Sequence, residues 1–217
     1  MSEQMIEILI KGIWETLYMT VVSTAFAYLL GIPLGVVLYI TDKNGICHNK
    51  TINFVVGAIV NMVRSVPFLI LLVAILPFTR LVVGTTIGST ATIVPLVIAA
   101  APFVARMVES SLKEVDAGVI EAAKAMGSSV PQIIFKVLLP EAKPSLLVGC
   151  TISLATILGY SAMAGFVGGG GLGAIAINYG YYRYQGDIMW ITVILLVVIV
   201  QLFQEIGLRI VRKVDKR

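Results

Sequence analysis

Long apolar stretches alternate with short polar segments along the whole chain, and five of the stretches are long enough to cross a bilayer. A transmembrane helix needs about 20 predominantly apolar residues. The five stretches lie at residues 16–40, 56–79, 90–108, 146–167 and 188–208. The pattern therefore predicts an all-α membrane protein with five transmembrane helices in a single domain, residues 1–217. Because five is odd, the two termini are expected on opposite sides of the membrane.

Composition and charge support a membrane protein and give it an orientation. The chain is 58% hydrophobic and 13% charged, with a mean hydropathy of +0.96, which lies outside the range of soluble domains. Placing the carboxyl terminus inside leaves Lys11, Arg80 and Arg183 outside and the other thirteen of the sixteen Lys and Arg residues inside. We therefore expect a periplasmic amino terminus and a cytoplasmic carboxyl terminus. The basic tail, residues 209–217, anchors this topology, so no nucleic-acid partner is needed to explain the charge.

The longest polar segment, residues 108–145, contains a short amphipathic helix. Apolar residues recur at helical spacing on one of its faces: Val119, Ala122, Ala123 and Met126. Glu121 and Lys124 lie on another face. Because the apolar face is rich in small alanines, we expect the helix to enter a groove on another protein. The alternative, a solvated hairpin on the membrane surface, would need larger apolar residues and a richer basic face.

Signals for helix ends divide this segment into two helices. Asp116 can accept hydrogen bonds from the first free amides, and Gly127 supplies the permissive backbone just past the end of the first helix. Ser129 and Gln132 form a capping-box pattern that begins a second helix, which Pro140 is expected to end. The prediction is a pair of short helices joined at a glycine corner.

Two membrane segments carry residues that are unusual for a lipid-facing helix. Gly31, Pro33 and Gly35 weaken the first span, and close packing of helices explains them better than a hinge. Arg64 places a guanidinium group in or beside the bilayer, where a charge costs roughly a few kcal/mol. It either snorkels to the cytoplasmic surface or orders the inner mouth of a translocation pathway.

The sequence lacks the motifs with which a chain would act alone. No G-x-x-x-x-G-K-[ST] segment is present for binding ATP, and no series of Asp, Glu or His residues lies within the spans as an ion relay. Gly168–Gly173 formally matches G-x-G-x-x-G, but no strand precedes it, so a flexible or tightly turned exit from the fourth span is expected. No catalytic constellation, disulfide or metal spacing is recognised, and no secretory signal peptide is evident. The chain is expected to be no enzyme by itself and to draw energy from a partner.

Several stretches resemble a known family. The Glu121-Ala-Ala segment with Gly127 and the later Leu139-Pro140 resembles the cytoplasmic loop of ATP-binding-cassette (ABC) importer permeases. Nearly the whole chain is similar to the methionine-uptake branch of these permeases, through the stretches Trp14–Leu17, Gly35–Tyr39, Arg64–Phe68, Pro77–Arg80, Ala101–Glu109, Lys136–Ala142 and Gly159–Met163. The loop alone indicates the superfamily, whereas these stretches together indicate the methionine branch.

The resemblance implies the type I importer permease fold, with residues 108–145 as a cytoplasmic coupling loop. It also implies a homodimer in the bacterial inner membrane, two cytoplasmic ABC ATPase subunits that bind ATP and Mg²⁺, and an external methionine-binding lipoprotein. This chain itself would hold no cofactor. The implied ATPase-coupling residues are Glu121, Ala122, Ala123, Met126 and Gly127, with Pro140 ending the supporting helix.

The resemblance also suggests a translocation pathway for D- and L-methionine by alternating access. Tyr160, Ser161 and Met163 lie in a stretch of small and polar residues, and the flexible thioether of Met163 could close a narrow apolar gate. Ordinary packing of Met163 explains its position equally well. Another small cargo, such as a different amino acid, glycine betaine or a phosphonate, is the alternative within the class. An ion-coupled secondary transporter fits less well, because no inverted repeat is visible.

Overall fold

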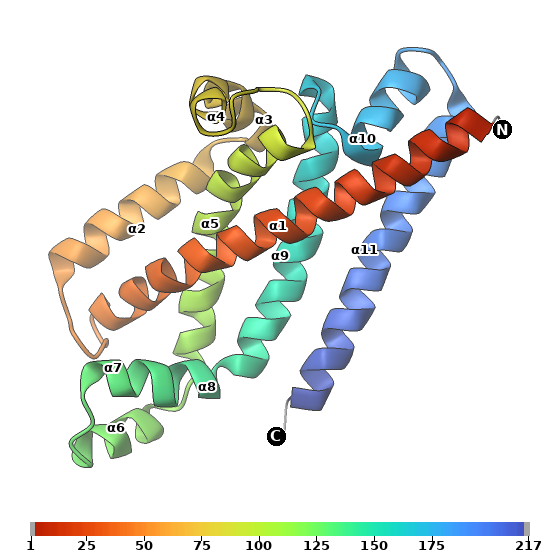
Figure 1. Cartoon of the computed structure of the whole chain (residues 1–217). Helices are drawn as coiled ribbons and strands as arrows, with labels where there is room; N and C mark the ends of the chain where they lie inside the picture. Colours follow the sequence, from red (N-terminus) through yellow and green to blue (C-terminus); the bar gives the residue numbers. More distant parts are fainter. Residues whose placement is uncertain (1–2, 215–217) are drawn as a thin grey trace.

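The computed structural model describes residues 3–214, and these form an all-α protein with no strand among them (Figure 1). The larger helices are α1 Glu3–Thr41, α2 Lys50–Ser65, α3 Phe68–Ala74, α4 Leu76–Val83, α5 Ser89–Lys113, α6 Ala117–Ala125, α9 Lys143–Ala164 and α11 Gly186–Val214. The short ones are α7 Val130–Ile133, α8 Leu139–Glu141 and α10 Gly171–Ile175, with a 3₁₀ turn η2 at Gly165–Val167 and π turns η1 at Ile134–Leu138 and η3 at Ala176–Tyr181. The predicted fold class is confirmed.

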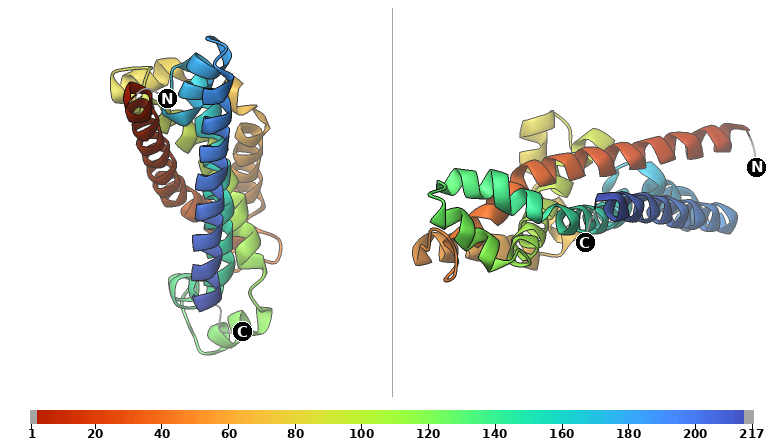
Figure 2. Two further views of the ribbon diagram at one scale, coloured as in Figure 1. Left: turned by 90° about the vertical axis from the view of Figure 1, so that its right-hand side faces the viewer. Right: turned by 90° about the horizontal axis from the view of Figure 1, so that it is seen from below.

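The long helices run between two ends of the molecule that carry different short elements. The pair α6–α7 lies at one end, and α3, α4 and α10 lie toward the other (Figure 1); both views of Figure 2 separate α6–α7 from α10 in the same way. The first residues of α1 and the last residues of α11 also lie at opposite ends. Lys216 and Arg217 of the predicted basic tail are outside the described residues.

Within residues 3–214, five segments are long and apolar enough to cross a membrane if one bent pair of helices is counted as a single span. Four are α1, α5, residues 143–181 and α11, and the fifth is the pair α2 and α3, bent by 100°. The prediction of one continuous span at residues 56–79 is therefore wrong. Pro67 has no amide hydrogen and disfavours helical geometry at the residue before it, and Val66 is extended, with φ −82° and ψ 125°. The following residues turn again into α4.

Close packing of α1 on α5 explains the glycines of the first span. α1 is continuous through Pro33. A Cβ atom on Gly31 would come within 2.6 Å of Val104 Cγ1, and one on Gly35 within 2.6 Å of Val108 Cβ. Both valines are fully buried in the main hydrophobic core. The glycines thus let the two helices approach each other, as the packing interpretation predicted.

The second helix of the polar loop does not end at Pro140, which corrects that prediction. The chain continues from α7 through η1 and α8 into α9, and Ala142 keeps near-helical angles, φ −75° and ψ −6°. The amide of Leu139 bonds to the carbonyl of Ile134, five residues back. This wider turn directly precedes Pro140 and relieves the clash that its ring would make in a regular α-helix. The polar pair of helices is thereby joined almost continuously to the membrane helix α9.

Candidate functional site: the coupling hairpin and the pathway segment

Residues next to helix α6 in the sequence determine where this helix begins and ends, as predicted. The Oδ1 atom of Asp116 accepts a hydrogen bond of 2.8 Å from the amide of Gly118. At the other end Gly127 is left-handed, with φ +76°, and its amide bonds to the Lys124 carbonyl at 2.9 Å. The amide of Ser128 reaches the Ala123 carbonyl at 3.1 Å, completing a Schellman motif. Local chemistry therefore fixes both the start of α6 and its glycine corner.

The next helix begins directly after this corner. The Ser129 amide donates to Oε1 of Gln132 at 2.8 Å, the bond that the capping-box pattern predicts. Ile120 and Ala123 of α6 belong to the same buried cluster as Ile133 and Leu138 of the following segment. The unit comprising α6, the Gly127 corner, α7 and η1, residues 117–138, is called the coupling hairpin below; it projects from one end of the molecule (Figure 1).

The exposed face of the hairpin differs from the predicted one at a single residue. Glu121, Ala122 and Gly127 are exposed, and Met126 has 79% of its surface accessible. Ala123 is instead 3% exposed. Its place beside Ile120 in the core, one turn apart on the inner face of α6, explains the difference. Ala123 therefore supports the hairpin from inside and offers no surface to a partner.

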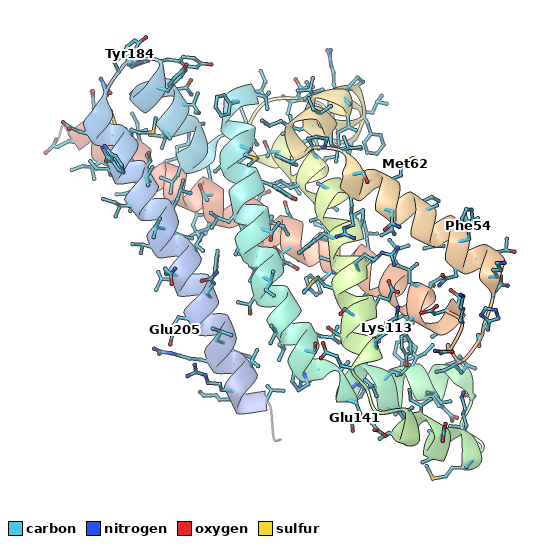
Figure 3. The ribbon with its side chains drawn as sticks, turned by 180° about the vertical axis from the view of Figure 1, so that it is seen from behind. Phe54, Met62, Lys113, Glu141, Tyr184 and Glu205 are labelled. Carbon is cyan, nitrogen blue, oxygen red and sulfur yellow. The ribbon has the colours of Figure 1, made fainter. Side chains whose placement is uncertain are left out.

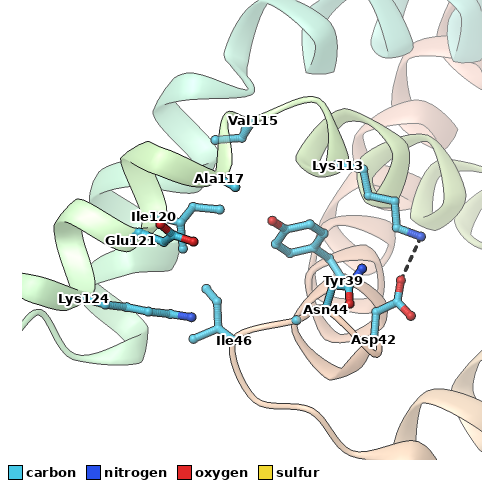
Figure 4. A pocket seen from close by; sticks show the side chains of 11 residues that line it. Tyr39, Asp42, Asn44, Ile46, Lys113, Val115, Ala117, Ile120, Glu121 and Lys124 are labelled. Carbon is cyan, nitrogen blue, oxygen red and sulfur yellow. Dashed lines mark ion pairs between the residues drawn. The ribbon is translucent and has the colours of Figure 1, made fainter.

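A cavity of about 310 Å³ lies between the hairpin and the loop that follows α1 (Figure 4). Its lining includes Asp42 and Ile46 of that loop, Lys113 at the end of α5 and Glu121 of α6. Asp42 Oδ2 and Lys113 Nζ are 3.1 Å apart. The Asp42 carboxylate also accepts the Lys43 amide, and this bond, with Lys113 adding to it, lowers the pKa of Asp42. The ion pair joins the loop that follows α1 to the helix that leads into α6.

The three pathway candidates do not share one surface. The ring of Tyr160 stacks on Phe68 of α3, with centroids 4.7 Å apart and planes inclined by 8°. Ser161 is 1% exposed and donates to the Leu158 carbonyl at 2.8 Å, so it does not line an open path in this chain. Met163 is 46% exposed and is the member free to meet another molecule. Among the described residues, no group of three or more His, Cys, Asp or Glu side chains could hold a metal ion.

Arg64 lies at the end of α2 that is farther from the coupling hairpin. It is an exposed residue in the last turn of α2, whereas α2 begins at Lys50, after the loop that contacts the hairpin. Figure 3 shows Met62, of the neighbouring turn, far from Lys113 and Glu141 at the hairpin end. The break before Pro67, which was not predicted, ends α2 one residue after Arg64.

One charged cluster was missed. Glu109 of α5 is buried and bridges two cations: Arg106 Nη1 lies 2.6 Å from its Oε2, and Lys113 Nζ lies 2.8 Å from its Oε1. Arg106 also donates to Asn61 of α2 at 2.9 Å. The spacing of three and then four residues places these side chains on one face of a helix, and this was the signal available in the sequence.

The fold and the hairpin together define a membrane component of a transport system. Residues 27–217 match the family of binding-protein-dependent transport system inner membrane components. The chain belongs to this family, and it is a multi-pass membrane protein.

Individual relatives narrow the comparison. The chain is 56% identical over 211 residues to the "Probable D-methionine transport system permease protein MetI" of Vibrio cholerae, covering 97% of this chain and 94% of the relative. It is 54% identical over 165 residues to the D-methionine transport system permease protein of Escherichia coli K12, with 76% of each covered. A chain of the inward-facing MetNI methionine ABC transporter matches with a TM-score of 0.98 and 53% identity, over 100% of both chains. An amino acid ABC transporter crystallised with histidines, at 21% identity and a TM-score of 0.79, shares the fold.

Proposed function

We propose that this chain is the permease subunit of an ATP-driven importer of D- and L-methionine. The observation that carries the proposal is the coupling hairpin. Its helix α6 is capped by Asp116, and it exposes Glu121, Ala122 and Met126. It occurs on a fold that matches the methionine transporter chain throughout. The relatives at 47–56% identity are named for D-methionine transport, which supports the cargo.

The proposed complex contains two copies of this chain, two cytoplasmic ABC ATPase subunits and an external methionine-binding lipoprotein. The ATPases bind ATP and Mg²⁺, so this chain is not an enzyme by itself and carries no cofactor of its own. The hairpin faces the cytoplasm, which places the carboxyl terminus inside and the amino terminus in the periplasm of the inner membrane. Exposed apolar residues such as Leu69, Ile70 and Leu81 provide surface for the bilayer and for the second copy.

The mechanism follows from the way the hairpin is attached. A groove on the ATPase receives the exposed face of α6, and closure of the ATPase pair on ATP draws the two hairpins together. Because only residues 114–116 separate α5 from α6, and η1 leads through α8 into α9, this motion reaches two membrane helices through short connections. The two halves then exchange an inward-open for an outward-open arrangement, which is alternating access. Met163 and Tyr160 remain the proposed pathway residues, the first as gate and the second through its stack on Phe68.

The test is transport by the complete complex. This chain, its co-purified ATPase and the binding protein are reconstituted in vesicles, and uptake of labelled L-methionine is measured with and without ATP. We expect ATP-dependent uptake that unlabelled D- and L-methionine suppress and that glycine betaine leaves unchanged. Suppression by glycine betaine alone would assign another cargo, and uptake that follows an ion gradient without ATP would refute the importer.

A further inference from the structure

We propose that Arg106 is a positioning residue that transmits movement of the coupling hairpin to α2 and its bend. This inference rests on the proposed function. It names the contact through which movement of the hairpin would reach the proposed pathway residue Tyr160. Arg106 lies on α5, two helical turns before the end of that helix. It touches neither the proposed cargo residues nor the exposed face of α6.

The first half of the connection runs from the hairpin to Arg106. Lys113 is the last residue of α5, and Asp116, which caps α6, follows three positions later. Lys113 Nζ is 2.8 Å from Oε1 of Glu109, and the other carboxylate oxygen is 2.6 Å from Nη1 of Arg106. Glu109 is 7% exposed, so each of its two partners neutralises a buried charge. Because Arg106, Glu109 and Lys113 all lie on α5, a movement of the end of this helix carries Arg106 with it, and the ion pairs hold the guanidinium in a fixed direction on the helix.

The second half runs from Arg106 to α2. The Nη2 atom donates to Oδ1 of Asn61 at 2.9 Å and approaches the Gly57 carbonyl at 3.4 Å. A Cβ atom on Gly57 would lie 3.5 Å from Nη2, an ordinary contact distance, so the guanidinium lies directly against this part of α2. Only Gly57 and Val60 of α2 are buried. The bonds from Arg106 therefore add to the packing of Val60 against Leu38 and Ala105 in holding the middle of this helix.

Helix α2 then carries the movement toward Tyr160 of α9. Asn61 lies one turn before Ser65, where α2 ends, and the chain bends by 100° into α3. The first residue of α3 is Phe68, whose ring stacks on Tyr160 of α9. The path from α6 to Tyr160 therefore combines side-chain contacts at Glu109, Arg106 and Asn61 with two stretches of backbone, residues 114–116 and the bend between α2 and α3. This path is the structural argument for coupling.

Arginine is suited to this position because it uses separate nitrogens for the two helices. Nη1 holds Glu109 while Nη2 holds Asn61. A lysine carries the same charge on one compact nitrogen and lacks the planar fork that serves two partners in fixed directions. Arg106→Lys therefore keeps the charge beside Glu109 and removes the link to α2.

The experiment compares uptake with ATP hydrolysis in the reconstituted complex. We expect Arg106→Lys to lower methionine taken up per ATP hydrolysed by about tenfold, within the range of typical coupling between sites, while hydrolysis stays within about twofold of wild type. Arg209→Lys is the matched control: Arg209 makes a 2.7 Å ion pair with Glu205 on the exposed face of α11, and its replacement should leave the ratio unchanged. An unchanged ratio in Arg106→Lys, or a parallel fall of both activities, would overturn the proposal.

A second variant tests the same contact from the other helix. Asn61→Ala truncates an exposed side chain of α2 and leaves the ion pairs of α5 intact, so the complex should assemble even if Arg106→Lys does not. We expect the same kind of fall in the ratio, and no further fall when both changes are combined, since they break one contact. Additive losses, or a normal ratio in Asn61→Ala, would refute the role of Arg106. If the wild-type complex shows no ATP-dependent uptake, the proposed function fails instead.

Discussion

Two glycine corners at opposite ends of the molecule look alike in sequence and differ in their surroundings. The corner at Gly127 closes α6, and a Cβ atom built there would meet nothing within 4 Å. The corner at Gly168–Gly171 joins α9 to α10, and there a Cβ atom on Gly171 would lie 2.7 Å from Thr16 Oγ1. Both Gly127 and Gly171 have positive φ, +76° and +73°. The close contacts of Gly171 make its corner a part of the core, whereas the corner at Gly127 is open to a partner.

The hydrogen bonds of the two corners differ in the same way. Asp116 caps α6 from two residues away, but the amide of Gly171 is held by Glu15 Oε2 at 2.7 Å, across 156 residues of sequence. The adjacent amide of Leu172 is bound by Thr16 Oγ1 at 2.9 Å. One corner is thus a self-contained unit that can be moved by a partner, and the other is fixed to α1. Substitutions that treat the two alike should separate their roles.

The largest effect is expected from Gly171→Val. A β-branched side chain at φ +73° is strained by about 1–3 kcal/mol, and its clash with Thr16 adds a similar cost of overpacking. Folding itself should fail or weaken strongly, so little protein should reach the membrane. The amount of chain in the membrane and its melting temperature in detergent measure this. Wild-type values for both would show that the corner is not rigidly packed.

Gly127→Val should produce a smaller loss of stability with a specific loss of function. The strain at φ +76° is again about 1–3 kcal/mol, but no neighbour is displaced, so the spans should fold. The shape of the hairpin should change, and uptake of methionine should fall about tenfold at normal membrane abundance. Gly84→Val is the matched control, because Gly84 ends α4 at φ +83° with equally open surroundings. Equal losses of uptake in both variants would show that strain alone is responsible.

The sequence predicted the open corner far better than the packed one, and the reason is the range of the contacts. Asp116, Gly127 and the pair Ser129 and Gln132 act on residues within three positions, so their spacing alone defines the hairpin. The role of Glu15 depends on a distant backbone amide, which no local pattern indicates.

Errors elsewhere have the same physical origin. Pro140 breaks a regular helix by local rules, yet the π turn at Ile134–Leu138 lets the chain continue. The sequence did not decide which side of α6 faces the core, because Ile120 on one side of Ala123 and Met126 on the other are both suited to burial. Only packing against the following segment decides that Ile120 and Ala123 turn inward.

The inward orientation of Ala123 can be tested with a pair of variants in the hairpin. Ala123→Leu should destabilise the protein by about 1–3 kcal/mol, because it inserts three carbons into a packed core. Ala122→Leu adds the same group on the exposed face and should change stability by less than about 0.5 kcal/mol. It should instead weaken binding of the ATPase, measured by co-purification. The reverse assignment of the two effects would mean that α6 is rotated relative to this structure.

The smallest expected effect separates the two caps. Glu15→Gln keeps the size of the side chain but replaces a charge-assisted bond to the Gly171 amide with a neutral one, at a cost of about 1 kcal/mol. Asp116→Asn makes the corresponding change at α6, where asparagine caps a helix about as well as aspartate, so a few tenths of a kcal/mol is expected. Thermal unfolding of both variants in the same detergent measures the difference. A larger loss in Asp116→Asn would mean that the hairpin, rather than the corner fixed by Glu15, is the end whose integrity limits the stability of the whole chain.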